Sequence, residues 1–223
     1  MKQEIDKNKI KAVIFDFDGV LVNSKRAIFK TYREACKGMG IKFYSSLAEF
    51  SKNIDGNYEH FYVRLGIPKK YFKKMSLAYK KHYRKFEKEV SLFSGVENVL
   101  KKLKSHGFKV GIVSNTHDYI IKYFLKKFRI AKYIDVVVGG NKIDRLKPDP
   151  AEINVAMKKM KVKPEETIFI GDMEVDMIAG RRAKVKNLIA VTYGYHPKSR
   201  LKKFNPDEFI EKPSKILNIL SIE

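Results

Sequence analysis

From residue 93 onward, short apolar runs with strand character alternate with segments of helical periodicity. The apolar runs are continuous, which is typical of strands that are buried on both faces of a parallel sheet. Regular alternation of strand and helix predicts a doubly wound α/β fold with helices on both faces of the sheet. The predicted strands are 109–113, 134–138, 167–170 and 187–191, and the predicted helices are 96–105, 119–128, 151–160, 176–182 and, more weakly, 213–220.

One further apolar run, residues 11–15, leads directly into Asp16, Phe17, Asp18 and Gly19. A buried strand there would hold both carboxylates on a rigid base, and the glycine would let the backbone turn. Two carboxylates this close repel each other unless a cation or a shared proton intervenes. Mg²⁺, which prefers oxygen ligands, is the simpler choice. Because Asp and Gly are also common turn residues, an ordinary strand-ending turn is the competing interpretation.

Residues 25–92 have helical patterns only, so we expect a small helical domain inserted after the first strand. Asn23 and Ser24 are interpreted as a capping pair for a helix over 25–37. Shorter helices are expected from Ser45 or Ser46 to residue 50 and over 57–65, and a long one after Pro68. Its apolar stripe favours core packing over ligand stacking; the stripe consists of Phe72, Met75, Tyr79, Tyr83 and Phe86. The predicted α/β core then comprises residues 1–24 and 93–223, and the predicted cap residues 25–92.

Polar side chains follow the second and third predicted strands of the core. Ser114, Asn115 and Thr116 offer hydroxyl, amide and backbone N–H groups to an anion, although Ser114 and Thr116 are also good helix caps. Lys147 stands just before a helix start in a loop held by two prolines, whereas an isolated lysine is usually solvated. In a doubly wound sheet, ligands bind beyond the carboxyl ends of the strands, which is where these residues are expected.

The fourth strand of the core leads into another acidic segment, with Asp172 at the strand end and Asp176 four residues later. Asp172 could reach a metal ion, and Asp176 could orient the ligands from the first helical turn. The strand ends together therefore supply carboxylates, a hydroxyl and one lysine to a single edge of the sheet.

The chain is strongly basic, with 47 Lys and Arg against 25 Asp and Glu and a formal net charge of +22. Residues 25–92 alone carry 17 Lys and Arg against 6 Asp and Glu. This charge fits an anionic substrate, a nucleic-acid surface or a solvated lysine-rich exterior. No apolar run approaches the roughly 20 residues of a membrane span, and the first residues do not resemble a signal peptide, so we expect a cytoplasmic protein. The single cysteine, Cys36, excludes an internal disulfide and is expected to be buried.

These motifs, in this order, resemble those of the haloacid dehalogenase superfamily. The first motif is matched by Asp16-Phe-Asp-Gly-Val-Leu-Val and the second by Ser114. Lys147-Pro-Asp-Pro matches the third motif, and Gly171-Asp followed after three residues by Asp176 matches the fourth. The helical insert is similar to the cap of the phosphoglycolate-phosphatase-like branch, so the resemblance covers the whole chain.

The resemblance implies a role for each matching residue. Asp16 would be the nucleophile that accepts the phosphoryl group, and Asp18 the general acid and base. Mg²⁺ would be held by Asp16, the backbone carbonyl of Asp18 and Asp172, with Asp176 in support. Ser114 and Lys147 would hold the phosphoryl oxygens; the substrate-binding set is Ser114, Asn115, Lys147 and Gly19.

The same resemblance narrows the activity. Dehalogenases of the superfamily lack the second carboxylate, which is present here as Asp18, and the sugar-phosphate mutases carry a histidine where this chain has Ile28. We therefore expect a Mg²⁺-dependent phosphatase for a small phosphomonoester, with phosphoglycolate as the default substrate. The protein is expected to be a monomer or a homodimer that does not associate with a membrane. Pyrophosphate or a nucleotide is an alternative substrate, and a basic nucleic-acid-binding protein is an alternative function. Three residues near predicted helix ends are candidates for cap specificity: Lys52, Asn53 and Arg64.

Overall fold

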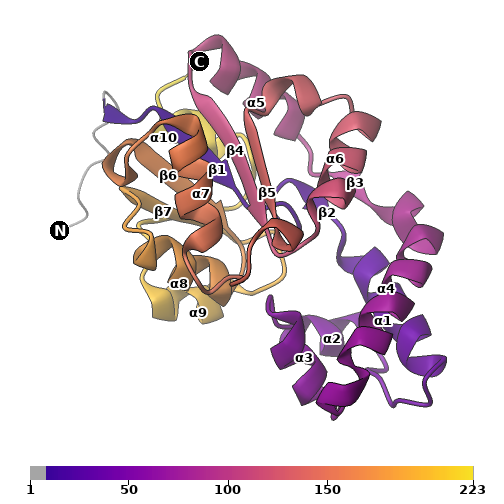
Figure 1. Cartoon of the computed structure of the whole chain (residues 1–223). Coiled ribbons are helices and arrows are strands. Elements are labelled where there is room, and N and C mark those ends of the chain that lie inside the picture. The colour runs from indigo at the N-terminus through magenta and orange to yellow at the C-terminus, as the bar shows by residue number, and fades with distance from the viewer. Residues whose placement is uncertain (1–8, 223) are drawn as a thin grey trace.

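The computed structural model of the chain describes residues 9–222, and its centre is a parallel β-sheet (Figure 1). The sheet has six strands in the order β5-β4-β1-β6-β7-β8, and every neighbouring pair is parallel. This confirms the predicted α/β class. The strands are β1 (Ala12–Phe15), β4 (Lys109–Ser114), β5 (Val136–Gly139), β6 (Thr167–Gly171), β7 (Asn187–Val191) and β8 (Glu208–Ile210).

Helices cover both faces of the sheet, as the continuous apolar strands predict. Alternate residues of β1 point to opposite sides, so that Val13 belongs to one apolar cluster and Ile14 to the other. The first cluster includes buried residues of α5 (Val96–Ser105), α6 (Asp118–Lys127) and α10 (Lys215–Ile219). The second includes those of α7 (Ala151–Met160), α8 (Glu174–Arg182) and α9 (Lys198–Leu201).

The register of the central strands places the functional loops side by side. Phe15, the last residue of β1, pairs with Ile112 on one side and Ile170 on the other. The carboxyl ends of β1, β4 and β6 therefore meet at one edge of the sheet, which is the arrangement that the polar strand ends predict.

The predicted boundaries are correct or nearly so for most elements of the core. Helices α5 and α7 have the predicted bounds, and α6, α8 and α10 differ by one or two residues at an end. The strand predicted at 134–138 is β5, which begins two residues later than predicted. Strand β8 and helix α9 were not predicted. Short 3₁₀ helices cover Lys69–Tyr71, Glu87–Glu89, Ala131–Tyr133, Gly140–Lys142, Pro164–Glu166 and Lys202–Phe204.

The segment between β1 and α5 is helical, as expected, and lies beside the carboxyl edge of the sheet (Figure 1). We call its four α-helices and the loops between them the cap: α1 (Lys25–Lys37), α2 (Leu47–Asn53), α3 (Tyr58–Arg64) and α4 (Phe72–Phe86). Met75 and Tyr83 of the α4 stripe are buried, and so is Cys36. None of the helices in residues 9–222 combines the length and apolar character that a membrane crossing requires.

Two short strands connect the cap to the core. Strand β2 (Val22–Asn23) pairs in antiparallel fashion with β3 (Ser91–Leu92). Asn23 therefore lies in a strand, and Ser24 makes no capping bond to α1; its hydroxyl lies 3.1 Å from the hydroxyl of Tyr195. Ser24 thus occupies the predicted N-cap position of α1 but makes no side-chain capping bond, and Asn23 belongs to β2 instead. The division of the chain into two domains stays a prediction, with β3 inside the range given to the cap.

Candidate active site

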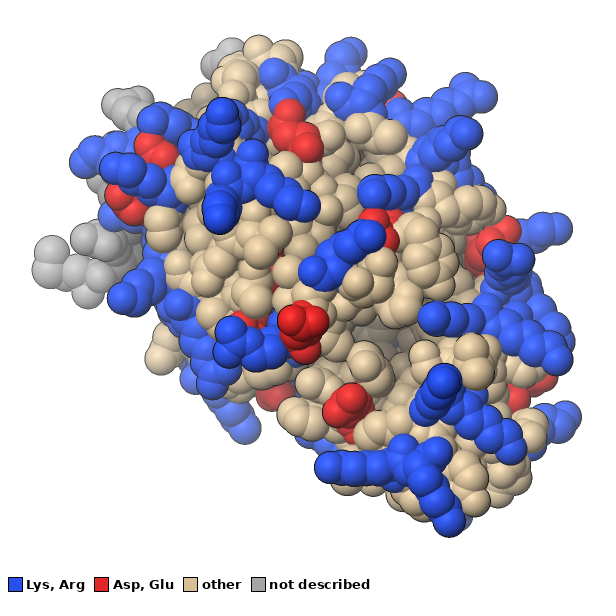
Figure 2. Space-filling model, in the orientation of Figure 1, with Lys and Arg blue, Asp and Glu red and all other residues tan. Residues whose placement is uncertain are grey.

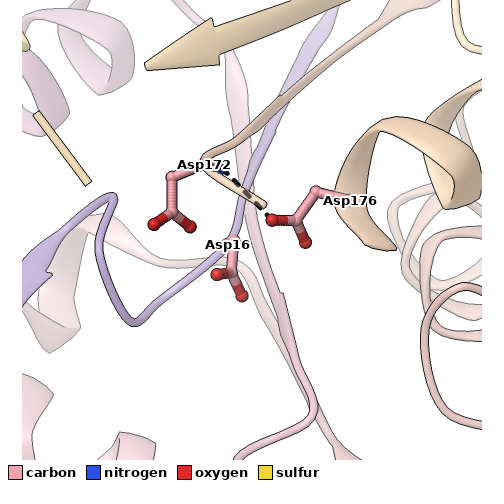
Figure 3. A group of neighbouring side chains, drawn as sticks. All are labelled: Asp16, Asp172 and Asp176. Atoms are coloured by element: carbon pink, nitrogen blue, oxygen red, sulfur yellow. Dashed lines mark hydrogen bonds between the residues drawn. The ribbon is translucent and has the colours of Figure 1, made fainter. Parts of the chain in front are cut away.

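Three buried carboxylates meet at the carboxyl edge of the sheet (Figure 3). Asp16 follows β1, Asp172 follows β6, and Asp176 lies in the first turn of α8. Each contributes one oxygen to a group whose atoms all lie within 4.8 Å of one another. The strand register thus brings together three of the four residues that the sequence nominates as metal ligands.

Lys147 supplies the positive charge inside this group. Its Nζ donates to Asp16 Oδ1 at 2.8 Å and to Asp176 Oδ1 at 2.7 Å, and its side chain is 3% exposed. Burial opposes the charged form, but the two carboxylates outweigh it and raise the pKa of Lys147. Burial also raises the pKa of Asp16, to about 7, although Lys147 works against this shift. A solvated surface role for Lys147 is therefore excluded.

The donor set fits a divalent cation. Three carboxyl groups surround one ammonium group, so full ionisation of the cluster would leave two negative charges in excess. Asp172 Oδ1 is buried and has no hydrogen-bond partner among residues 9–222, whereas Asp172 Oδ2 accepts from the Tyr195 N–H at 2.6 Å. Burial and the neighbouring carboxylates raise the pKa of Asp172. An orphaned buried oxygen within an acidic cluster is the environment that a bound Mg²⁺ would satisfy.

Asp176 differs from the other two carboxylates because both of its oxygens are occupied. Oδ1 accepts from Lys147, and Oδ2 accepts from the backbone N–H of Met173 at 2.9 Å. Oδ2 also accepts from the backbone N–H of Asp172 at 3.1 Å (Figure 3). These bonds fit the supporting role expected for Asp176, which holds the turn that presents Asp172.

Gly19 has a structural role that differs from the predicted one. Its N–H donates to the carbonyl of Val22 at 2.8 Å. Its φ is +84°, and a Cβ there would lie 2.2 Å from Asp172 Oδ2. The placement of Gly19 in the substrate-binding set stays a prediction, and the structure adds a reason for the glycine: the loop turns tightly against Asp172.

Asp18 lies beside this group rather than within it. The Thr116 hydroxyl donates to Asp18 Oδ2 at 2.7 Å, and Asp18 Oδ1 is buried without a partner in the described part of the chain. Burial raises the pKa of Asp18, and hydrogen bonds from neighbouring hydroxyls oppose the shift. The proton-transfer role of Asp18 and the contact of its backbone carbonyl with a metal both stay predictions.

Ser114 ends β4, Asn115 and Thr116 follow it in the loop, and none of the three caps α6. Residue His117 occupies the N-cap position and makes no side-chain cap bond. The Ser114 hydroxyl instead accepts from the Thr116 N–H at 3.2 Å, and its side chain is buried beside the carboxylates. The alternative interpretation of these hydroxyls as caps is therefore wrong. The contact of Thr116 with Asp18 was not foreseen.

The side chain of Asn115 connects three parts of the site. Its Nδ2 donates to the carbonyl of Gly56 in the cap at 2.6 Å and to that of Lys147 at 3.2 Å, and its Oδ1 accepts from the Lys147 N–H at 2.9 Å. Both ends of the side-chain amide therefore bond to the protein. A contact between Asn115 and the substrate stays a prediction, and it would use the backbone of Asn115.

A cavity of about 190 Å³ lies between the cap and the carboxylates. Its floor includes Asp16, Asp18, Ser114 and Lys147, and its walls come largely from the cap. Figure 2 shows the surface hollowed between the two parts of the molecule. The cavity lining does not include the three residues predicted to set cap specificity, which are Lys52, Asn53 and Arg64. Arg64 is 3.1 Å from Asp55, which does line the cavity.

The basic side chains do not gather at one place on the face shown in Figure 2. Lys and Arg are spread over both the core and the cap, with Asp and Glu among them. A dispersed distribution of this kind is typical of a solvated exterior, whereas nucleic-acid-binding proteins usually carry a basic stripe or patch.

The fold and the site together define an α/β enzyme with a buried acidic centre beneath a helical cap. The chain belongs to the haloacid dehalogenase-like hydrolase family, whose model matches residues 13–190. It is similar to the phosphoglycolate phosphatase of Aquifex aeolicus, with 27% identity over 95% of this chain and 97% of the relative. It is also similar to the pyrophosphatase PpaX of Bacillus mycoides, with 26% identity over 96% of this chain and 98% of the relative.

Solved structures agree with this assignment. A Bacteroides fragilis protein assigned to the haloacid dehalogenase-like hydrolases superposes with a TM-score of 0.87 at 25% identity and covers 93% of this chain and 99% of its own. A haloacid dehalogenase-like hydrolase of Streptococcus pneumoniae has the same fold, with a TM-score of 0.84 at 23% identity over 95% of this chain and 98% of its own. The predicted family and the prediction that the protein is an enzyme are confirmed.

Proposed function

We propose that this hydrolase is a Mg²⁺-dependent phosphatase that cleaves phosphomonoesters through a phosphoryl group carried on Asp16. The observation that supports the proposal best is the position of Asp16, which is buried against Lys147 on one side and faces the cavity with Asp18 beside it. A nucleophile, a proton donor and a cation thus converge where a phosphate would enter.

The first half of the reaction forms the phosphorylated enzyme. Asp16 Oδ1 is held by Lys147, and Oδ2 has no hydrogen bond among residues 9–222 and is free to attack phosphorus. The bond to the leaving alcohol breaks as Asp18 transfers its proton to the departing oxygen. Burial favours the protonated form of Asp18 that this step requires.

The second half regenerates the free enzyme. Asp18, now ionised, takes a proton from a water molecule that attacks the same phosphorus atom. The bond to Asp16 breaks, and inorganic phosphate leaves. Dividing one displacement into two steps with a carboxylate nucleophile avoids the direct attack of water on a charged ester.

Positive charge and hydrogen-bond donors stabilise the phosphoryl oxygens during both transfers. Lys147 and the Ser114 hydroxyl lie at the floor of the cavity and would contact these oxygens directly. When bound by Asp16, Asp172 and the carbonyl of Asp18, Mg²⁺ would supply the remaining positive charge that neutralises the phosphoryl group and the crowded carboxylates.

Two substrates are suggested by the relatives, one of which is named a phosphoglycolate phosphatase and the other a pyrophosphatase. Both reactions use the same nucleophile and differ only in the leaving group. A nucleotide stays possible for the same reason, and the choice depends on the cavity rather than on the carboxylates.

The test is phosphate release from a panel of phosphate esters and pyrophosphate, with Mg²⁺ present or chelated. We expect release to require Mg²⁺ and to fall by more than about 10³-fold in Asp16→Asn. Mass spectrometry of the acid-quenched enzyme should find the phosphoryl group on Asp16. Wild-type activity of Asp16→Asn would remove the mechanism, and RNA binding that weakens steeply with salt, without phosphatase activity, would favour a nucleic-acid function.

A further inference from the structure

The wall of the cavity opposite the carboxylates is a continuous array of tyrosines from three cap helices. Tyr32 comes from α1, Tyr58 and Tyr62 from α3, and Tyr79 and Tyr83 from α4, and all five line the cavity. Neighbouring rings contact one another, with centroids 4.7 Å apart for Tyr32 and Tyr79 and 5.6 Å apart for Tyr79 and Tyr83. These spacings are those of favourable aromatic pairs, so the wall is a preformed aromatic surface.

Two of these tyrosines also present polar groups that nothing in the protein satisfies. The hydroxyls of Tyr79 and Tyr83 have no hydrogen-bond partner within the described range, although Tyr83 is only 6% exposed. Burial and the nearby Asp18 raise the pKa of both phenols, so they remain protonated donors. Hydroxyls that line the cavity without a protein partner can donate to a bound substrate, and they favour a leaving group with a hydrogen-bonding edge.

The charges in the lining disfavour a second anionic group on the substrate. Besides Lys147, which two carboxylates already hold, the basic groups of the lining are Lys80 and His117. Lys80 is exposed, and burial lowers the pKa of His117, so its imidazole is neutral at neutral pH. Asp55 also lines the cavity, but its carboxylate is paired with Arg64 at 3.1 Å and adds little net charge. The carboxylate of phosphoglycolate or the second phosphate of pyrophosphate would thus meet little positive charge.

The cavity has room for a leaving group with one ring. An apolar cavity of about 150 Å³ holds a single benzene molecule, and this cavity measures about 190 Å³. A six-membered ring is therefore within the size that this cavity can hold.

From these observations, we infer that the leaving group is an uncharged alcohol bearing one aromatic or heteroaromatic ring with a hydrogen-bonding edge, which stacks on the tyrosine wall of the cap. This inference rests on the proposed phosphatase function and adds the class of substrate to it. It places recognition in the cap and the chemistry in the core.

The first experiment compares benzyl phosphate with cyclohexylmethyl phosphate. Both are esters of primary alcohols with a six-membered ring and the same charge, so they differ mainly in aromaticity. We expect kcat/KM for benzyl phosphate to be higher by about tenfold, and also to exceed the values for phosphoglycolate and pyrophosphate. A hydroxyl on the ring, in 3-hydroxybenzyl phosphate, should raise kcat/KM further in the wild type but not in Tyr83→Phe.

The second experiment changes the wall itself. Tyr79→Leu removes the ring at similar bulk and should erase the preference for benzyl over cyclohexylmethyl phosphate, whereas Tyr79→Phe keeps the ring and should retain it. Tyr71→Leu is the matched control, since Tyr71 is exposed at 39% and does not line the cavity. If Tyr79→Leu does not fold, the wild-type comparison of the two ring esters decides the question.

The outcomes separate this inference from the function on which it rests. Equal kcat/KM for the two ring esters, or a higher value for phosphoglycolate or pyrophosphate, overturns the aromatic leaving group and leaves the phosphatase intact. Absence of Mg²⁺-dependent phosphate release from all of the esters and from pyrophosphate overturns the proposed function and the inference with it.

Discussion

Lys147 and Asp16 are 131 positions apart in the chain, yet the Nζ of Lys147 lies 2.8 Å from Oδ1 of Asp16 in the interior of the protein. The same ammonium lies 2.7 Å from Asp176. A buried cation between two carboxylates is the main compensation for the negative charge of this site. Its removal should therefore affect both stability and activity.

Lys147→Met should lower phosphate release by at least about 100-fold because it deletes a donor to the phosphoryl oxygens. Without Mg²⁺ it should also lower the free energy of unfolding by about 3–5 kcal/mol at neutral pH, since it leaves buried carboxylates without a partner. Denaturant titration checks the second effect. Lys159→Met, on the exposed side of α7, is the matched control and should change neither quantity. Equal behaviour of the two variants would contradict the assignment.

Asp172→Asn tests the metal site with a readout that does not require turnover. In the wild type, millimolar Mg²⁺ should raise the temperature of unfolding because the ion binds only the folded state. The variant loses one charged ligand, so this increase should shrink or vanish. Without Mg²⁺ the variant should be at least as stable as the wild type, because the neutral amide relieves repulsion among the carboxylates. An undiminished Mg²⁺ effect would place the ion elsewhere.

The burial of Glu152 should make the free energy of unfolding depend on pH in a specific way. It is fully buried in α7, neither carboxylate oxygen has a partner within residues 9–222, and burial raises its pKa to about 7. Because the folded state holds this proton more tightly than the unfolded state, stability is retained below about pH 4.5 and lost as the pH rises toward 7.

Glu152→Gln removes this titration while keeping the shape of the side chain. Its free energy of unfolding should match that of the wild type near pH 4 and exceed it by about 3 kcal/mol at pH 8. Denaturant titrations of both proteins across this range measure the difference. A constant difference at all pH values would show that Glu152 does not titrate in the folded protein.

Gly56→Ala tests the contact between cap and core. A Cβ at Gly56 would lie 2.4 Å from Cγ2 of Val175 and would push the cap loop away from Asn115, which donates to the Gly56 carbonyl. We expect kcat/KM to fall by about tenfold, since a displacement of this kind disturbs the alignment of the site. Gly38→Ala is the control in the same cap, because its Cβ would meet only ordinary contacts at 3.5 Å or more. Steady-state kinetics with one substrate compares the two variants.

The central features of this fold could be predicted from local sequence patterns. Continuous apolar runs identify β1, β4, β6 and β7 because both faces of these strands are buried. Strand β8 was missed because Glu208 and Phe209 at the edge of the sheet are only partly buried and the three residues have no clear pattern. Strands β2 and β3 have two residues each, which is too short for a periodicity.

The candidate site could be predicted only as far as the strand ends determine it. The register of three adjacent strands sets the positions of Asp16, Ser114 and Asp172 directly. The cap wall depends on how helices from distant segments pack, so the α4 stripe indicated a buried face without showing that Tyr79 and Tyr83 reach the cavity. The bonds of the Asn115 amide to Gly56 and Lys147 likewise have no local signal.

The pairing of β2 with β3 means that the chain leaves the core and returns to it through neighbouring residues, Val22 opposite Leu92 and Asn23 opposite Ser91. The hydrogen bonds of the six-stranded sheet are therefore independent of whatever sequence fills the interval. One consequence is that the length and sequence of the insert could change without breaking any hydrogen bond of the sheet.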